Sequence, residues 1–357
     1  MARKAKAAAA AAVEAPVYVP VDSDFVLKDN ADSIAIDENF ASQSFWKDAL
    51  IRFFHKTSAV VGLVLIVLIT IFAIVGPGMN KYSYSDQNLT QKNLAPRVAA
   101  FENSGILDGS ETIHTSSGDK KINYYKEYKL DDVYYWFGSD NFGRDIWTRT
   151  WQGARVSLII AVAAAIIDMV IGMSYGLISG YFGGKVDMVM QSILEVCNGI
   201  PRLVIVTLLL LILKPGMGTI IFALMLTEWV GMSRIARAEM LKLKEMEFVL
   251  ASRTLGAGSF FIIFKEILPN IIGPIITQVM FSIPTAIFTE AFLSFVGLGI
   301  PVPQCSLGSL ISLGFNALTT HSYQIVPPLI VMALLMLSFN LVGDGLREAL
   351  DPKMKEM

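Results

Sequence analysis

Five ionisable residues fall inside long apolar stretches of this 357-residue sequence. A charged side chain at lipid depth costs free energy unless it pairs with an opposite charge or lines a water-filled cavity. Each residue is therefore a candidate for a pathway lining or an intramembrane ion pair. The five residues are Asp168, Glu195, Arg202, Glu228 and Glu290.

One pair among these residues is expected from helix geometry. If the stretches around Asp168 and Arg202 form an antiparallel hairpin, the two side chains lie about 5 Å apart along the helix axis, within reach of each other. We expect a buried ion pair here, in which the charges either only hold helices together or line a pathway. Glu290 is expected to have a structural or gate-related role.

The residues that usually carry catalysis or bind metals are scarce and scattered. The two cysteines lie in separate apolar segments, and the three histidines are far apart without a His-Glu-x-x-His motif, so we expect neither a disulfide nor a metal site. A membrane-embedded enzyme is therefore disfavoured. The sequence has no Gly-x-x-x-x-Gly-Lys-Ser/Thr phosphate loop, so any energy from ATP must come from another chain.

The composition is that of a membrane protein. Hydrophobic residues make up 54% of the chain and charged residues 17%, which excludes an ordinary soluble enzyme. With 29 basic and 31 acidic residues, the chain lacks the basic excess that binds nucleic acid, so nucleic acid is not expected as a partner.

Apolar stretches of sufficient length predict six membrane-spanning helices. Thr57–Val75 contains no charged residue, and the stretch from Ala291 to Gly343 is interrupted by a Gly/Pro-rich part. The predicted spans are 57–75, 156–179, 186–213, 217–233, 267–289 and 324–341.

Basic residues near the ends of the spans predict the orientation of the chain. Both termini are expected on the cytoplasmic side, since that side then carries nearly all the basic residues of the short connections. The predicted parts of the chain are a disordered cytoplasmic tail (1–42), an amphipathic interfacial helix (43–56), the first transmembrane helix (57–75), an extracytoplasmic loop domain (76–154), a core of five transmembrane helices (155–349) with a cytoplasmic coupling loop (240–269), and a cytoplasmic tail (350–357).

The cytoplasmic loop between the fourth and fifth spans has the pattern of two short helices. The first starts at Glu247 and ends at Gly256, a residue that permits the left-handed turn common at helix C-termini, and the second runs to Pro269. Such a pair forms a compact knob that could receive a motion from a soluble partner. From the residues alone, an amphipathic connector resting on the membrane is as probable.

This loop resembles the EAA loop of ABC importer permeases. The Glu-Ala-Ala positions of that loop correspond to Leu250, Ala251 and Ser252, so two of the three residues differ. Its glycine and its Leu-Pro ending correspond to Gly256 and to Leu268-Pro269. The resemblance implies contact with ATPase subunits through Glu247, Leu250, Ala251, Ser252, Arg253, Gly256, Ala257, Leu268 and Pro269.

Five further stretches resemble the second permease subunit of oligopeptide and dipeptide importers, and the resemblance covers residues 43–357. The departures from that family are the long N-terminal tail and the enlarged outer loop. The five stretches are 137–145, 153–158, 180–184, 290–299 and 339–352.

The resemblance implies an all-α membrane protein with six transmembrane helices of the type I ABC importer permease kind and an outer loop domain. Its function is then to form half of the peptide pathway in the plasma membrane of a bacterium. The implied partners are a second homologous permease subunit, two ATP-binding subunits that hold ATP-Mg, an extracytoplasmic peptide-binding protein and the peptide substrate. No cofactor is expected on this chain.

Two other transport functions stay open at this point. Sister branches with similar motifs make a permease for nickel or another small solute the main alternative. A secondary transporter is less favoured, because the six spans show no obvious inverted repeat.

Overall fold

A computed structural model describes residues 45–101, 105–115, 118–214 and 216–350. The expected tail 1–42 and residues 351–357 of the expected C-terminal tail lie outside this range. The described chain is mostly helical, with one two-stranded antiparallel sheet made of β1 (Ser110–Thr115) and β2 (Gly118–Asn123). The described residues from Trp46 onward form one compact unit, whose elements are given below.

Five helical stretches are long and apolar enough to cross a membrane. A sixth crossing results if α7 (Gly184–Gly199) and α8 (Arg202–Ile212), which are bent by 78° relative to each other, count as one broken span. Pro201 lies in this break, where an interior proline cannot continue the helical hydrogen bonds. The described chain thus has five such stretches, and it has the six crossings expected from the sequence if the broken pair counts as one. The five stretches are Thr57–Gly78, Ile146–Phe182, Met217–Leu243, Ser259–Phe295 and Ser322–Leu350.

The elements of these stretches follow one another with short breaks. The N-terminal part contains α2 (Phe45–His55), α3 (Thr57–Val75) and η2 (Gly76–Gly78). The middle part contains α5 (Ile146–Ile167), a π-helical turn η5 (Asp168–Gly172), α6 (Met173–Phe182), α9 (Met217–Thr227) and α10 (Trp229–Leu243). The C-terminal part contains α11 (Glu247–Thr254), α12 (Ser259–Phe261), a π-helical turn η6 (Ile262–Ile267), α13 (Leu268–Phe295), α14 (Leu307–Asn316), η7 (Ser322–Gln324) and α15 (Val326–Leu350).

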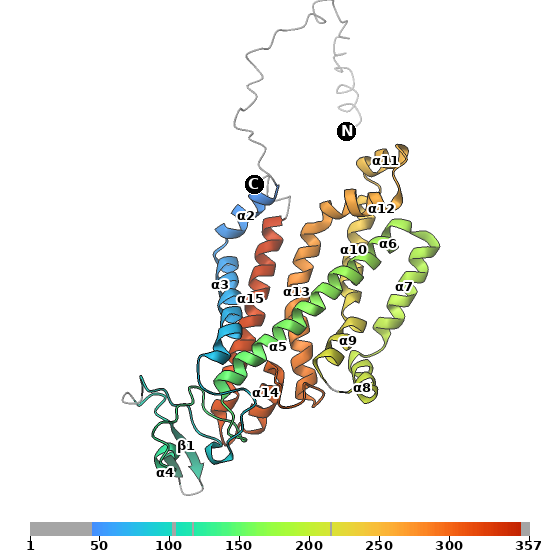
Figure 1. The fold of residues 1–357 in the computed structure, drawn as a ribbon. Helices are drawn as coiled ribbons and strands as arrows, with labels where there is room; N and C mark the ends of the chain where they lie inside the picture. The colour runs from blue at the N-terminus through green and yellow to red at the C-terminus, as the bar shows by residue number, and fades with distance from the viewer. Residues whose placement is uncertain (1–44, 102–104, 116–117, 215, 351–357) are drawn as a thin grey trace, which may run out of the picture. The chain divides into compact units, whose positions relative to one another are not determined.

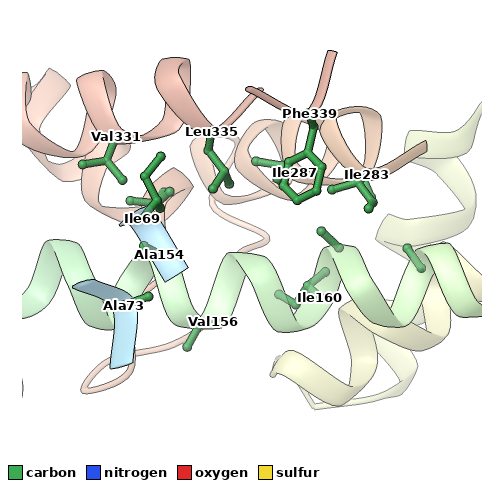
Figure 2. Packing of buried hydrophobic residues seen from close by; sticks show 14 of the residues in the cluster. Ile69, Ala73, Ala154, Val156, Ile160, Ile283, Ile287, Val331, Leu335 and Phe339 are labelled. Atoms are coloured by element: carbon green, nitrogen blue, oxygen red, sulfur yellow. The ribbon is translucent and has the colours of Figure 1, made fainter. Parts of the chain in front are cut away.

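The largest apolar core lies between α3, α5, α9, α13 and α15. Figure 2 shows part of it, with Ile69 of α3, Ile160 of α5, Ile287 of α13 and Leu335 of α15 packed against one another. Residues up to 270 positions apart in the chain, from Ile69 to Phe339, meet here. This core fixes the relative positions of the spans that frame the site described below.

Three glycines let α6 and η5 approach α10 at backbone distance. A Cβ atom on Gly176 would lie 2.2 Å from the carbonyl oxygen of Ser233, and one on Gly172 would lie 2.5 Å from that of Trp229. Gly180 faces Met240 in the same way. Small residues at four-residue spacing allow this close packing between membrane helices.

Replacing Gly176 with leucine is expected to destabilise the protein by about 3 kcal/mol, because the new side chain forces α6 and α10 apart. The matched control is Gly231→Ala on α10, where a Cβ meets nothing within 4 Å. Chemical unfolding of the detergent-solubilised protein measures both variants. Equal stability of the two would contradict the close approach of α6 and α10.

The outer segment between η2 and α5 holds η3 (Leu89–Gln91), the β1–β2 hairpin and α4 (Tyr124–Glu127). Its small core contains Leu94, Tyr125 and Tyr135. The Arg97 guanidinium lies 5.0 Å from the ring centre of Tyr125 and 4.5 Å from that of Tyr134. This packing makes the segment an ordered part of the unit rather than a plain connection.

The outer segment ends earlier than the expected boundary at Ala154. The carboxylate of Asp145 accepts a hydrogen bond from the Thr148 backbone N–H at 2.8 Å and caps α5, so the helix begins at Ile146. The polar and aromatic residues 146–154 concealed this early start in the sequence, because they interrupt the apolar run.

The two ends of the helix bundle differ in what they carry. In Figure 1, α11 and α12 lie at one end, while β1 and α4 lie at the other. The helix α2 and the C-terminal end of α15 are at the same end as α11, and an ion pair between Lys56 and Glu348 (2.5 Å) joins them. One end therefore presents a helical projection and the other the outer segment.

Candidate functional site

The projection at one end of the bundle consists of α11, a tight turn and α12. Gly256 has a φ of +83°, the left-handed conformation that glycine adopts without strain. The Gly256 N–H donates to the carbonyl oxygen of Arg253, and the Ala257 N–H donates to that of Ser252, both at 3.0 Å. These two bonds form a Schellman motif, which ends α11 and reverses the chain direction.

The base of this projection is anchored by apolar contacts. Val249 of α11 is fully buried in a cluster with Ile262, Ile263 and Ile267 of η6. The same cluster includes Met240 of α10, so the projection is fixed to two spans at once. This cluster therefore joins α11 to α10 and to the turn η6 that leads into α13.

Two polar contacts complete the anchoring. The Ser252 hydroxyl donates to the carboxylate Oε1 of Glu266 at 2.5 Å, across the Gly256 turn. The guanidinium of Arg253 lies 4.9 Å from the ring centre of Tyr181 on α6. The projection thus contacts a third span and keeps its orientation relative to the bundle.

The second helix of the projection does not end at Pro269, contrary to the sequence-based expectation. It continues from Ser259 through η6 into α13, so the helix is unbroken to Phe295. The π-helical turn Ile262–Ile267 precedes Pro269 directly. Its wider hydrogen-bond spacing accommodates the missing N–H and the ring of the proline.

The surface of the projection exposes apolar side chains. Leu255 is 87% exposed, Leu250 is 46% exposed and Phe260 is 66% exposed. The helix α11 lies outside every candidate span, whereas Phe260 lies at the start of one, Ser259–Phe295. A cluster of exposed apolar side chains on a rigid element is typical of a protein–protein contact.

The residues expected to contact ATPase subunits divide into two groups in the structure. Ser252, Ala257 and Leu268 are half-buried and belong to the base. The others are exposed: Glu247, Leu250, Ala251, Arg253, Gly256 and Pro269.

Several residues of the projection were missed by sequence reasoning. Val249 and Glu266 form its base, while Leu255 and Phe260 form much of its exposed face. Leu255 could have been found from its place directly before the turn glycine. The pairing of Ser252 with Glu266 had no local signal, since the two residues meet only after the chain reverses.

Glu290 is the buried centre of a polar network at the junction of three helices. It is fully buried, and its carboxylate accepts hydrogen bonds from the hydroxyls of Ser157 (3.1 Å) on α5 and Ser294 (2.8 Å) on α13. The Leu307 N–H at the start of α14 donates to the Ser157 hydroxyl at 3.2 Å. Glu290 therefore links α5, α13 and α14.

The other intramembrane charges are only partly described. Asp168 and Glu228 are buried, whereas Glu195 is exposed on α7. The side chain of Arg202 lies outside the described part of the chain, so its pairing with Asp168 stays a prediction. Glu195 lies on α7 and is exposed, whereas Glu290 lies on α13 and accepts hydrogen bonds from serine hydroxyls.

Comparison with known proteins identifies the family. The model of the binding-protein-dependent transport system inner membrane component matches residues 172–356, and that of the N-terminal TM domain of oligopeptide transport permease C matches residues 44–96. The oligopeptide transport system permease protein OppC of Bacillus subtilis (strain 168) is 42% identical over 315 residues, which are 88% of this chain and 92% of that protein. The chain belongs to this permease family.

Other similar proteins carry related names. The dipeptide transport system permease protein DppC of Bacillus subtilis (strain 168) is 40% identical to this permease over 335 residues, 94% of each chain. An inward-facing structure of the MetNI methionine ABC transporter has a TM-score of 0.48 and 16% identity, and it covers 56% of this permease and 95% of that chain.

The family membership defines the class of activity. The permease is a membrane-embedded transporter subunit of an ABC importer and not an enzyme, since ATP hydrolysis in these systems belongs to partner subunits. The resemblance that the sequence motifs indicated is confirmed. The fold expected from that resemblance agrees with the six crossings described above.

Proposed function

We propose that this permease forms half of the translocation pathway of an ATP-driven peptide importer and receives its driving motion at the projection 247–269. The exposed, rigidly based projection is the observation that carries this proposal. The names of its relatives, which are oligopeptide and dipeptide transport permeases, support peptides as the cargo.

The proposed partners follow from the two ends of the bundle. Two ATP-binding subunits, which hold ATP-Mg, dock at the end that carries α11. An extracytoplasmic peptide-binding protein docks at the end that carries the outer segment, and a second homologous permease completes the pathway. The helix α2 and the C-terminal end of α15 lie at the same end of the bundle as α11. If the ATP-binding subunits dock at that end, both termini are cytoplasmic in a bacterial plasma membrane.

The intramembrane charges are proposed to differ in their roles. Glu195, which is exposed on α7, is the favoured candidate for the pathway lining, because a charge at lipid depth needs water or a partner. Asp168, Arg202 and Glu228 are proposed to stabilise the packing of neighbouring spans. Glu290 is proposed to hold α14 in place through its serine network.

Uptake of labelled peptide into ATP-loaded vesicles that contain the complete complex tests this function. We expect uptake that requires ATP and that unlabelled peptide inhibits, whereas nickel ions do not. Inhibition by nickel without inhibition by peptide would favour the small-solute alternative. Peptide uptake that persists after complete removal of ATP would contradict the ATP-driven mechanism and favour a secondary transporter.

A further inference from the structure

The helix α2 uses only one of its faces to pack against the bundle. Phe53 is buried with Ala59 of α3 and with Val342 and Ala349 of α15. A Cβ atom on Gly345 would lie 3.2 Å from the Phe53 ring, which shows how closely α2 approaches α15. The described part of the chain does not cover the side chains on the neighbouring face of α2 in this way.

This neighbouring face forms an open groove of about 370 Å³. Its apolar floor exposes Leu50 (57%) and Phe54 (56%), with Ile51 beside them. Lys47 lies at one end of the groove and His55 at the other. The five residues follow the i, i+3, i+4, i+7, i+8 pattern of one helical face, so the groove runs along α2.

Among the described residues, the charges around the groove leave Lys47 without a carboxylate partner. Arg52 pairs with Asp48 at 3.0 Å, and Lys56 pairs with Glu348 at 2.5 Å. No acidic side chain among the described residues pairs with Lys47, which is exposed at the edge of the apolar floor. The groove therefore combines an apolar surface with a lysine that no acidic side chain of the described chain pairs with.

The position of the groove points to the kind of molecule that covers it. The membrane span begins at Thr57, two residues after α2 ends, so Leu50 and Phe54 lie within about 11 Å of helix rise from the membrane boundary. At that depth the surrounding molecules are phospholipids, whose phosphates meet lysine ammonium groups while the chains cover apolar residues.

We propose that this groove is a binding site for an anionic phospholipid of the inner leaflet. The lipid phosphate lies against the Lys47 ammonium group, and the upper part of an acyl chain lies against Leu50, Ile51 and Phe54. The choice of the inner leaflet depends on the proposed orientation of the permease, but the binding chemistry does not. The site fixes α2, and through Phe53 also the contact between α3 and α15, to the membrane surface.

Retention of lipid by the purified full complex tests this proposal. The complex is reconstituted in nanodiscs of phosphatidylcholine and phosphatidylglycerol, re-extracted in mild detergent and analysed for bound lipid by mass spectrometry. We expect Lys47→Glu to lower the retained phosphatidylglycerol at least about fivefold, the change that corresponds to one lysine near an anionic surface. Phosphatidylcholine retention should remain unchanged.

Lys185→Glu is the matched control. Lys185 is also exposed near the start of a helix, α7, but it lies outside the groove. A second variant, Phe54→Ser, should lower the retention of both lipids. An equal loss with Lys47→Glu and Lys185→Glu, or equal retention of both lipids by the unmodified protein, would overturn the proposal. The assay needs neither ATP nor peptide, so its outcome is independent of the transport function.

Discussion

Replacing Gly256 with proline is expected to reduce ATP-driven peptide uptake at least about tenfold. Proline fixes φ near −65°, whereas Gly256 adopts +83°, and the substitution also removes the N–H that donates to Arg253. The combined cost of about 3 kcal/mol or more exceeds what the short helix α11 can absorb locally. The turn then rearranges and Leu255 leaves its place on the exposed face. ATP-dependent uptake into vesicles with equal amounts of assembled complex measures the effect.

Gly258→Ala provides the control for this prediction. Gly258 lies two residues further along the same turn, has a φ of −70°, and a Cβ there meets nothing within 4 Å. Alanine is therefore compatible with its conformation, and uptake should stay near the normal rate. If Gly256→Pro transported as well as Gly258→Ala, the shape of the projection would be irrelevant to transport.

Replacing Glu290 with alanine is expected to destabilise the protein by about 3 kcal/mol. The substitution removes the acceptor of the Ser157 and Ser294 hydroxyls in a fully buried site and leaves a cavity between α5 and α13. The loss should also loosen α14, because its first N–H donates to Ser157. Chemical unfolding of the purified protein measures the stability, and limited proteolysis between α13 and α14 measures the loosening.

Glu290→Gln separates the hydrogen bonds from the charge. The amide keeps one of the two acceptor oxygens and nearly the same volume, and the serine hydroxyl that faces its NH2 group can turn to accept, so most of the stability should remain. A glutamine variant as unstable as the alanine variant would show that a carboxyl group, rather than an acceptor of this shape, is required. An alanine variant as stable as the unmodified protein would contradict the role of Glu290 in holding the three helices together.

The sequence was most informative where a single physical constraint acts on a continuous run. The helix α3 covers Thr57–Val75, the same residues as the first expected span, because a charge-free apolar run of this length is sufficient to cross the membrane. Gly256 was likewise identifiable, since few other residues adopt a positive φ at a helix end. These features depend on neighbours along the chain alone.

Features that depend on distant residues were not predictable in the same way. Glu290 was expected to line a pathway, to join an ion pair or to have a structural or gate-related role, but its partners could not be named, because Ser157 is 133 positions away and comes from another helix. The contact between Ser252 and Glu266 requires the turn at Gly256 to form first. The continuation of the helix past Pro269 depends on the π-helical turn before it, for which the sequence carries no established pattern.

The most direct test of the account is a cross-linking experiment at the tip of the projection. In the assembled complex, Cys197 and Cys305 are first replaced by serine. Leu255→Cys then places a single cysteine at the most exposed apolar position of the projection. Leu89→Cys in the outer segment, at a residue that is 65% exposed, is the comparison site. We expect a thiol-reactive cross-linker to join Leu255→Cys, but not Leu89→Cys, to an ATP-binding subunit, with a yield that changes when ATP is added. Capture of the ATP-binding subunit from position 89, or no capture from position 255 in a complex that transports peptide, would contradict the account.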